Sequence, residues 1–253
     1  MGQYVAFPKA RSHIHHFMRQ ARKVAPIQMI ATVDLTRVRQ AQRRHRAQGV
    51  HVSVSSFAVK AAALALAKYP EANITVRRSL RPRVYQHDAV NCLMLFDKQV
   101  DGGAAVVSAR IPGPDRMDLL AIQEIVDHYR ATPYEDNDGL RDLRTLHRLP
   151  FWLGRIVYRS VTRHPRRRAE VEGSFTFTRI NQPRVIAALP QINNTLGLVG
   201  SATVDTPVVR DGRVVVRPAM HLVLAFDHDA IDGTLAAKFL DETCRILDDW
   251  NQP

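Results

Sequence analysis

Apolar residues recur along the chain at two spacings, which divide it into alternating helical and extended segments. Segments in which apolar side chains return every three or four residues predict helices, and Val- and Ile-rich segments with partial alternation predict strands. The predicted helices cover residues 11–22, 35–48, 58–67, 117–130 and 234–250. The predicted strands cover residues 27–34, 83–85, 89–96, 104–108, 174–178, 196–200, 208–216 and 220–226. This order predicts a mixed α/β fold.

Turn-forming residues mark the ends of several of these segments. Pro26 prevents the first helix from continuing, and Pro70 follows the Ala-rich helix 58–67, whose small side chains favour close packing in a core. Asp211 and Gly212 separate two Val-rich runs and predict a hairpin turn. Neither an internal repeat nor a low-complexity linker divides the sequence, so we expect a single domain.

Residues 133–170 form a segment of different character. An acidic turn at 135–139 is followed by a basic stretch with aromatic and apolar side chains, which ends at Arg166, Arg167 and Arg168. A basic amphipathic helix of this kind fits a membrane surface or nucleic acid, and it equally fits a solvated or subunit-facing helix whose arginines bind phosphate. The sequence leaves these interpretations open, including peripheral membrane contact.

The chain carries a large excess of basic residues. Its 253 residues include 36 Lys and Arg against 24 Asp and Glu, a formal charge of +12, and 45% of them are hydrophobic, enough for a sizeable core. The positive charge favours a polyanionic partner such as nucleic acid, anionic lipid or a phosphorylated carrier. Because Arg binds phosphate through two parallel donors, coenzyme A or a phosphopantetheine carrier fits the composition as well.

The two cysteines and a group of three histidines are potentially reactive, but their sequence surroundings favour structural roles. Cys92 and Cys244 lie within apolar patterns and are expected to be buried free thiols. His13, His15 and His16 are expected on a solvated face because of their spacing on an amphipathic helix. No Cys or carboxylate set completes a metal site with them, so we expect no metal.

Two further patterns bear on location and cofactor. Gly102-Gly103 and Gly197-x-x-Gly200 lack the strand and helix context of a dinucleotide site, so they are interpreted as turn or packing glycines. The N-terminal residues lack a secretory signal pattern, and no apolar stretch approaches the ~20 residues that cross a bilayer. We therefore expect a cytoplasmic protein.

The most informative segment is the end of the last predicted strand and the acidic turn after it. Residues 222–233 read Leu-Val-Leu-Ala-Phe-Asp-His-Asp-Ala-Ile-Asp-Gly, so His228 directly follows a buried strand. A histidine can take a proton from a thiol, hydroxyl or amine that attacks a thioester, and return it to the leaving group, because its pKa lies near neutrality. His228 is therefore the candidate general base; taken alone, a structural histidine or a metal ligand is the alternative.

The pattern around His228 belongs to a set of motifs spread over most of the chain. These motifs are Arg11 with Met18 seven residues later, Ala25-Pro26, Val33-Asp34-Leu35-Thr36, Phe57-x-x-Lys60, Pro70-Glu71-Ala72-Asn73, residues 173–178 (Gly-Ser-Phe-Thr-Phe-Thr), Val216-Arg217-Pro218 and His228-x-x-x-Asp232-Gly233 followed by Ala-Ala-x-Phe-Leu. In these motifs and their order the chain resembles the acyltransferase catalytic domain of 2-oxoacid dehydrogenase complexes and chloramphenicol acetyltransferase. Residues 97–170 match this family weakly.

The resemblance implies roles for four residues besides His228. Thr178 occupies the position of a family serine whose hydroxyl donates to the oxyanion of the tetrahedral intermediate, and Thr176 is the fallback donor. Threonine keeps the hydroxyl, although its methyl group restricts the rotamer; the alternative is that both threonines simply favour a β-strand. Asp232 is implied to form a buried ion pair with Arg11 and thereby to fix the turn that presents His228.

The chain also departs from the family pattern. Residues 179–183, Arg-Ile-Asn-Gln-Pro, replace the family's Asn-Leu-Gly and would reshape the acceptor pocket. We expect no lipoyl domain, subunit-binding domain or Ala/Pro-rich linker, which disfavours docking into a large dehydrogenase complex. Asp227 and Asp229 are interpreted as loop and solvent residues.

The resemblance predicts a chloramphenicol acetyltransferase-like α/β fold over residues 1–253, with a mixed central sheet flanked by helices, assembled as a homotrimer. It implies an active site between subunits, with His228 and Thr178 from neighbouring chains. Acyl transfer would proceed from a coenzyme A or carrier-protein thioester to a thiol, hydroxyl or amine, with no bound cofactor and coenzyme A as co-substrate. One alternative is a catalytically silent trimeric scaffold; another is nucleic-acid binding through Arg166, Arg167 and Arg168, which predicts salt-dependent affinity for DNA.

Overall fold

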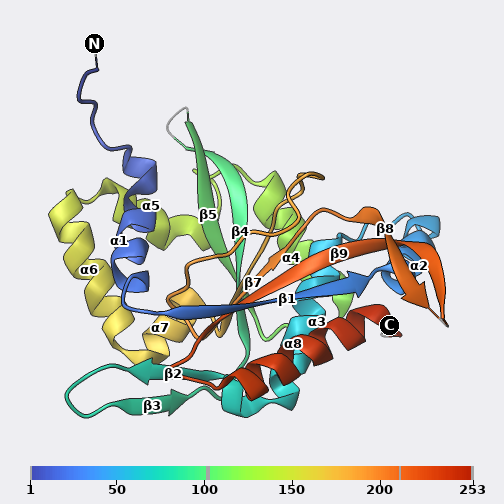
Figure 1. Ribbon diagram of the computed structural model, residues 1–253. Helices are drawn as coiled ribbons and strands as arrows, with labels where there is room; N and C mark the ends of the chain where they lie inside the picture. The colour runs from blue at the N-terminus through green and yellow to red at the C-terminus, as the bar shows by residue number, and fades with distance from the viewer. Residues whose placement is uncertain (1, 101–102, 211, 252–253) are drawn as a thin grey trace.

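A seven-stranded mixed sheet forms the centre of the molecule (Figure 1). The computed structural model describes residues 2–100, 103–210 and 212–251. Six strands follow the order β1 (Pro26–Asp34), β9 (Arg213–Asp227), β7 (Leu196–Gly200), β6 (Phe175–Arg179), β4 (Asn91–Val100) and β5 (Gly103–Pro112), and β8 (Val204–Arg210) also pairs with β9. β6 runs parallel to both of its neighbours, and the other pairs are antiparallel. The predicted mixed sheet is therefore confirmed.

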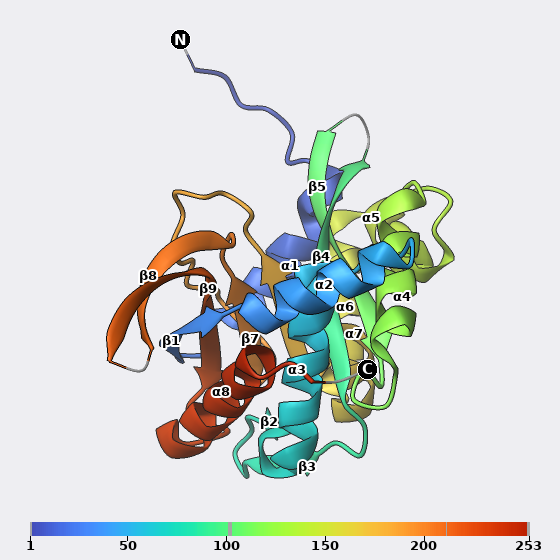
Figure 2. The ribbon, with the colours of Figure 1, turned by 90° about the vertical axis from the view of Figure 1, so that its right-hand side faces the viewer.

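Eight α-helices surround this sheet within the described ranges. They are α1 (Ser12–Ala21), α2 (Thr36–Ala47), α3 (Val54–Lys68), α4 (Leu119–Ala131), α5 (Arg141–Arg148), α6 (Phe151–Arg163), α7 (Pro165–Glu172) and α8 (Gly233–Asp248). Short 3-10 turns occur at Lys9–Arg11, Pro70–Ala72 and Asp138–Leu140. α3 and α8 pack side by side against the sheet, whereas α1, α5, α6 and α7 gather at the left of Figure 1, where β1 begins (Figures 1 and 2). The predicted flanking helices are confirmed.

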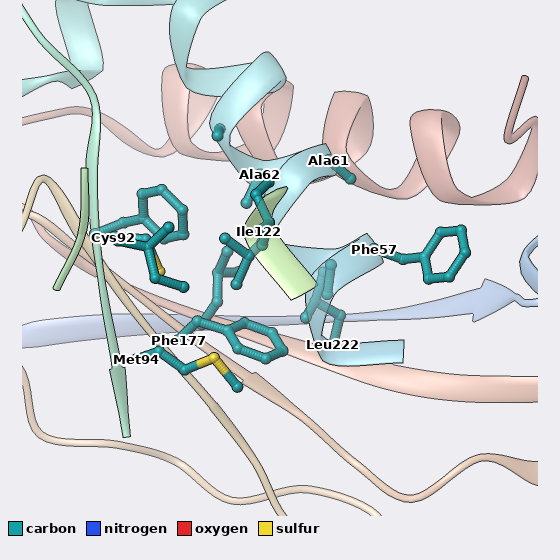
Figure 3. Close-up of a cluster of buried hydrophobic side chains, with 14 of the residues drawn as sticks. Phe57, Ala61, Ala62, Cys92, Met94, Ile122, Phe177 and Leu222 are labelled. Carbon is teal, nitrogen blue, oxygen red and sulfur yellow. The ribbon is translucent and has the colours of Figure 1, made fainter. Parts of the chain in front are cut away.

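The buried helix α3 organises the core. Ser53 caps its first turn by accepting a hydrogen bond from the Ser56 amide (3.2 Å), and the alanines that follow allow neighbouring elements to approach closely. Figure 3 shows the resulting cluster, in which α3 and α4 face side chains of β4, β6 and β9. Cys92 lies in this cluster, and both it and Cys244 are buried free thiols as predicted. Burial raises the pKa of the Cys244 thiol to about 12.

β9 is one continuous strand, although the sequence predicted two runs separated near Pro218. The backbone donor and acceptor of a strand residue face the same neighbour. The Pro218 carbonyl accepts from the Leu35 amide (2.8 Å), so its missing N–H faces the place where β1 has just ended. The proline therefore removes no hydrogen bond from the pairing with β8.

Two short strands and two turns complete the comparison with the predicted elements. β2 (Ile74–Arg77), which the sequence did not predict, pairs with β3 (Arg83–Gln86) in a separate two-stranded sheet. In the predicted β8–β9 hairpin, Gly212 has a φ of +73° and Arg210 pairs with Arg213, whereas Asp211 lies outside the described residues. Gly102, interpreted as a turn glycine, also lies outside them.

The basic stretch within 133–170 is divided into three helices. Pro150 and Pro165 lie at the junctions, because a proline is tolerated at a helix start and not inside one. Gln20 of α1 donates to the Thr162 hydroxyl of α6 (2.7 Å), which ties this stretch to the rest of the molecule. Across the described ranges, every helix is too short or too polar to span a membrane.

Candidate active site

His228 lies in the turn between β9 and α8. Its side chain is exposed in the isolated chain, and its ring packs on that of Phe226, with 5.6 Å between the ring centroids. The turn closes because the Asp227 carbonyl accepts from the amides of Ala230 (2.9 Å) and Ile231 (3.1 Å). The buried end of β9, residues 222–227, thus holds the imidazole at the surface, where a second molecule can reach it.

An arginine from another part of the fold fixes this turn. The Arg78 guanidinium donates from Nη2 to both carboxylate oxygens of Asp227 (2.6 and 2.5 Å) and from Nε to Asp229 (2.9 Å). The Asp227 side chain is only 6% exposed, so its charge depends on this partner. The interpretation of Asp227 as a loop or solvent residue was therefore wrong. Arg78 directly follows β2, a strand that the hydrophobic pattern did not predict, so no sequence signal pointed to it.

The implied ion pair between Arg11 and Asp232 is absent from the described chain. Both residues are exposed, and the Asp232 carboxylate instead caps α8 by accepting from the Leu235 amide (2.8 Å). Arg11 precedes α1 and lies in a turn that contacts β5 and α5. The C-terminal end of α1 leads into β1 and toward the His228 turn. The ten residues of α1, a rise of about 15 Å, separate Arg11 from that end.

The two candidate oxyanion donors share one face of β6. Phe175 and Phe177 point into the core, so Thr176 and Thr178 point the other way and are half-buried. The Thr176 hydroxyl accepts a hydrogen bond from the Asn194 amide group (2.9 Å). Within the described ranges the Thr178 side chain makes no hydrogen bond, which leaves its hydroxyl available to donate.

Thr178 and His228 are far apart within one chain. In the sheet Thr178 pairs with Val199, and Val199 pairs with Val223, five residues before His228. With ~3.3 Å per residue along a strand and ~4.8 Å between strands, the two side chains are separated by roughly 20 Å. The two residues of one chain therefore cannot both hydrogen-bond the same reacting group, and such a site requires a second chain.

Two of the three consecutive arginines of α7 contact different neighbours. Arg166 donates to the Tyr85 hydroxyl (2.9 Å), and Arg168 pairs with Glu172 (2.8 Å) and donates to Asn193 (3.2 Å). Within the predicted cluster of Arg166, Arg167 and Arg168, Arg168 therefore already has a carboxylate partner.

The histidines of α1 are not on a solvated face, contrary to the sequence interpretation. The His16 side chain is 3% exposed, and the His13 ring hydrogen-bonds His147 of α5 (2.8 Å) and the Val106 carbonyl (3.0 Å). A carbonyl only accepts, so a neutral His13 must donate from Nε2 to Val106 and accept at Nδ1 from His147. The His147 ring then accepts from Tyr134 (2.7 Å). This chain joins α1 to the helices that follow residue 133.

No group of three or more His, Cys, Asp or Glu residues is placed to hold a metal ion in the described part of the chain.

Comparison with curated proteins identifies relatives over most of the chain. It is 25% identical over 228 residues to the dihydrolipoyllysine-residue succinyltransferase component of the 2-oxoglutarate dehydrogenase complex of Haemophilus influenzae, covering 88% of this chain and 46% of that protein. The protein of the same description from Cupriavidus necator is 29% identical over 226 residues, with the same coverage. The chain therefore spans about half the length of these relatives.

Solved structures share the fold. A probable dihydrolipoamide acetyltransferase of Listeria monocytogenes superposes with a TM-score of 0.74 at 20% identity, over 98% of this chain and 94% of that one. An Azotobacter vinelandii dihydrolipoamide acetyltransferase, studied for the roles of a serine, a histidine and an asparagine in its catalytic mechanism, gives 0.73 at 19% identity, over 99% and 93%. Chloramphenicol acetyltransferase gives 0.54 at 17% identity, over 98% and 100%.

The family model for the 2-oxoacid dehydrogenases acyltransferase (catalytic domain) matches residues 2–132 and 167–253. The unmatched residues 133–166 contain α5 and α6. Because the match covers well over half of the sequence, the chain belongs to the 2-oxoacid dehydrogenase acyltransferase catalytic-domain family.

Proposed function

We propose that this protein is an acyltransferase that moves an acyl group from a thioester of coenzyme A or of a carrier protein to a thiol, hydroxyl or amine acceptor. The observation that carries the proposal is the exposed His228 at the end of β9, in a turn held by Arg78. Family membership and the names of the curated relatives, which are acyltransferase components, support the reaction class.

His228 acts as the general base. A ring nitrogen takes the proton of the acceptor as the acceptor heteroatom attacks the thioester carbonyl carbon, and a tetrahedral intermediate with an oxyanion forms. When this intermediate collapses, the carbon–sulfur bond breaks and the thiolate takes the proton back from the imidazolium. The reaction needs no covalent acyl-enzyme, and coenzyme A takes part as a co-substrate and not as a bound cofactor.

The Thr178 hydroxyl donates a hydrogen bond to the oxyanion. Both hydroxyls keep a hydrogen to donate, since Thr176 only accepts from Asn194; Thr178 is favoured because it occupies the position of the family serine. A well-placed oxyanion donor lowers the barrier by roughly 3 kcal/mol.

The site forms between subunits of a homotrimer. The separation of roughly 20 Å between Thr178 and His228 in one chain means that the two can serve one reaction only from neighbouring subunits. A contact that uses different surfaces on the two partners closes into a ring when its rotation closes, as in a trimer.

Asp232 positions the catalytic turn through its cap on α8. The Azotobacter protein studied for its mechanism has an asparagine four residues after its histidine, the spacing of Asp232 from His228. An asparagine cannot form an ion pair, but it caps a helix as well as an aspartate does. Capping is therefore the role that both side chains can share.

The test measures thiol release from a panel of acyl-coenzyme A and acyl-carrier thioesters, with and without candidate acceptors. His228→Ala should abolish turnover and leave the oligomer unchanged by size-exclusion chromatography. His51→Ala, the same replacement at an exposed loop position, is the control and should retain turnover. Equal turnover by His228→Ala and the wild type, or silence of the wild type across both thioester classes, contradicts the proposal and leaves the silent scaffold.

A further inference from the structure

Large apolar side chains are exposed together at the start of α6. Trp152 and Ile156 lie one turn apart on the helix, and Phe151 precedes them; all three are exposed. The Phe151 ring packs edge-on against the exposed ring of Phe7, with 6.1 Å between the centroids. Single exposed apolar residues are ordinary on a protein surface, whereas a contiguous group marks a contact surface. We call Phe7, Phe151, Trp152 and Ile156 the apolar ridge.

A cationic groove lies beside the ridge, between α1, α6 and the end of β2. Its cavity has a volume of about 450 Å³ and is lined by eight Arg and Lys side chains, with no Asp or Glu among the lining residues in the described part of the chain. Arg155, Arg159 and Arg163 of α6 form one wall. Six of the eight cations, these three included, form no ion pair with any described residue, so their charge is available to an anionic partner.

The ridge and the groove meet on the outer side of α6. Residues three and four apart on a helix are neighbours, so Trp152 lies next to Arg155 and Ile156, and Ile156 lies next to Arg159. The buried Gly154 faces the rest of the protein on the opposite side of the helix. The outer side of α6 therefore presents aromatic and aliphatic side chains with arginines directly beside them.

An anionic lipid surface has the chemistry that matches both features. Trp and Phe side chains favour the boundary between headgroups and hydrocarbon, Ile favours the hydrocarbon, and Arg binds lipid phosphate through two parallel donors. Duplex nucleic acid would bind the arginines and leave Trp152 and Ile156 without an apolar partner. A second copy of this chain would bring a further formal charge of +12 to a surface that is already positive.

The helix α2 provides a comparison within the same molecule. It carries five arginines, its one large apolar residue, Val38, is buried, and it lies on the opposite side of the molecule from α6 (Figure 1). Positive charge alone would draw α2 to an anionic surface as strongly as α6. The exposed ridge beside the arginines distinguishes α6, and α6 belongs to residues 133–166, which the family model leaves unmatched.

We propose that α6 docks this protein on the surface of a membrane that contains anionic phospholipids. The apolar ridge inserts among the headgroups, and Arg155, Arg159 and Arg163 bind the lipid phosphates. This contact is independent of the proposed acyl transfer, because none of these residues takes part in it.

The test is co-sedimentation of the full chain with vesicles of phosphatidylcholine alone and of phosphatidylcholine mixed with phosphatidylglycerol. The wild type should bind the mixed vesicles at least about tenfold more tightly, and high salt should weaken this binding. Trp152→Ser/Ile156→Ser, which leaves the charge unchanged, should lose at least about tenfold in affinity, and so should Arg155→Gln/Arg159→Gln. The matched control, Arg43→Gln/Arg44→Gln, removes two exposed arginines of α2 and should stay within about twofold of the wild type.

Tryptophan fluorescence reports the insertion itself. The chain has two tryptophans, of which Trp152 is 66% exposed and Trp250 is 4% exposed. Mixed vesicles should shift the wild-type emission to shorter wavelength, because Trp152 moves from water to the headgroup region, and brominated lipids should quench it. Trp152→Phe keeps an aromatic ring, so it should still bind the vesicles while the shift disappears.

Three results would overturn the proposal. The first is that the wild type does not bind mixed vesicles, and the second is that Trp152→Ser/Ile156→Ser binds them as tightly as the wild type, because charge alone then accounts for the attraction. The third is that another partner occupies this surface in place of lipid. Duplex DNA binding that only Arg155→Gln/Arg159→Gln weakens would assign it to nucleic acid, and a changed oligomer mass in Trp152→Ser/Ile156→Ser would assign it to a subunit contact.

Discussion

Replacing Arg78 by glutamine should both loosen the catalytic turn and destabilise the fold. The substitution leaves the Asp227 carboxylate, 6% exposed, without its charged partner. Removing one partner of a buried pair costs ~3–5 kcal/mol. Because 29% of the Arg78 side chain is exposed and Asp229 is mostly exposed, water screens part of the interaction, and we expect a loss of about 2–3 kcal/mol. For a chain of this length that corresponds to a fall in Tm of roughly 5–10 °C.

The assay combines denaturant unfolding with steady-state turnover. Turnover should fall about 100-fold, since a displacement near 1 Å of a catalytic group has effects of that size. Arg81→Gln, in the same loop without an ion pair in the described chain, is the control. The double variant Arg78→Gln/Asp227→Asn should recover much of the stability, because the buried charge is gone. Wild-type stability and turnover in Arg78→Gln would refute the role assigned to this ion pair.

Three further perturbations test other parts of the account. Thr178→Val should lower kcat by about 100-fold or more while Thr178→Ser retains it, and Thr176→Val should change kcat little; equal losses at both positions would contradict the assignment of the donor. Stability should fall as the pH drops from 6.5 toward 4, because burial and the His147 neighbour lower the His13 pKa to about 4, so the unfolded chain takes up the proton first. The loss is at most about 3 kcal/mol, and denaturation curves of His13→Gln should show a shallower pH dependence; parallel curves would contradict this. Gly173→Ala should lower the unfolding midpoint much more than Gly49→Ala, because both glycines have a positive φ and only at Gly173 would a Cβ meet backbone, 2.9 Å from the Leu93 amide nitrogen; similar midpoints would contradict it.

Local patterns were sufficient to predict most of the elements. Hydrophobic spacing placed α3, α4, α8 and the main strands within a few residues of their observed bounds, because each of them buries one apolar face or is wholly apolar. The patterns failed for β2, which is four residues long, and at Pro218, where a proline usually ends a strand and here faces an edge. They also did not show where the basic stretch would divide, although Pro150 and Pro165 carried that signal.

In the candidate site, too, some features follow from neighbouring residues in the sequence, whereas others depend on residues far away in the sequence. The position of His228 follows from the strand and turn around it, and the cap by Asp232 follows from its place before a helix. The pairing of Arg78 with Asp227 joins residues 149 positions apart, and no short motif specifies it. The ion pair expected between Arg11 and Asp232 was inferred from the family resemblance. It is absent because Arg11 lies at the N-terminal end of α1, the end away from the His228 turn.

One wall of the cationic groove between α1, α6 and the end of β2 could have been predicted from a spacing of arginines in the sequence. Arg155, Arg159 and Arg163 recur every four residues, which places them on one face of a helix. The spacing could not show that α1 and β2 would place further cations opposite that face, because this depends on the tertiary packing.

Subunit complementation tests most directly whether His228 and Thr178 act across a boundary between chains. Inactive His228→Ala and Thr178→Val chains are unfolded together in equal amounts, refolded and assayed for acyl transfer. In randomly mixed trimers about a quarter of the boundaries join an intact histidine to an intact threonine, so about a quarter of wild-type turnover should return. Mixing His228→Ala with the double variant His228→Ala/Thr178→Val restores no histidine and should stay inactive. If the first mixture is as inactive as this control, the two residues do not form one site across a subunit boundary.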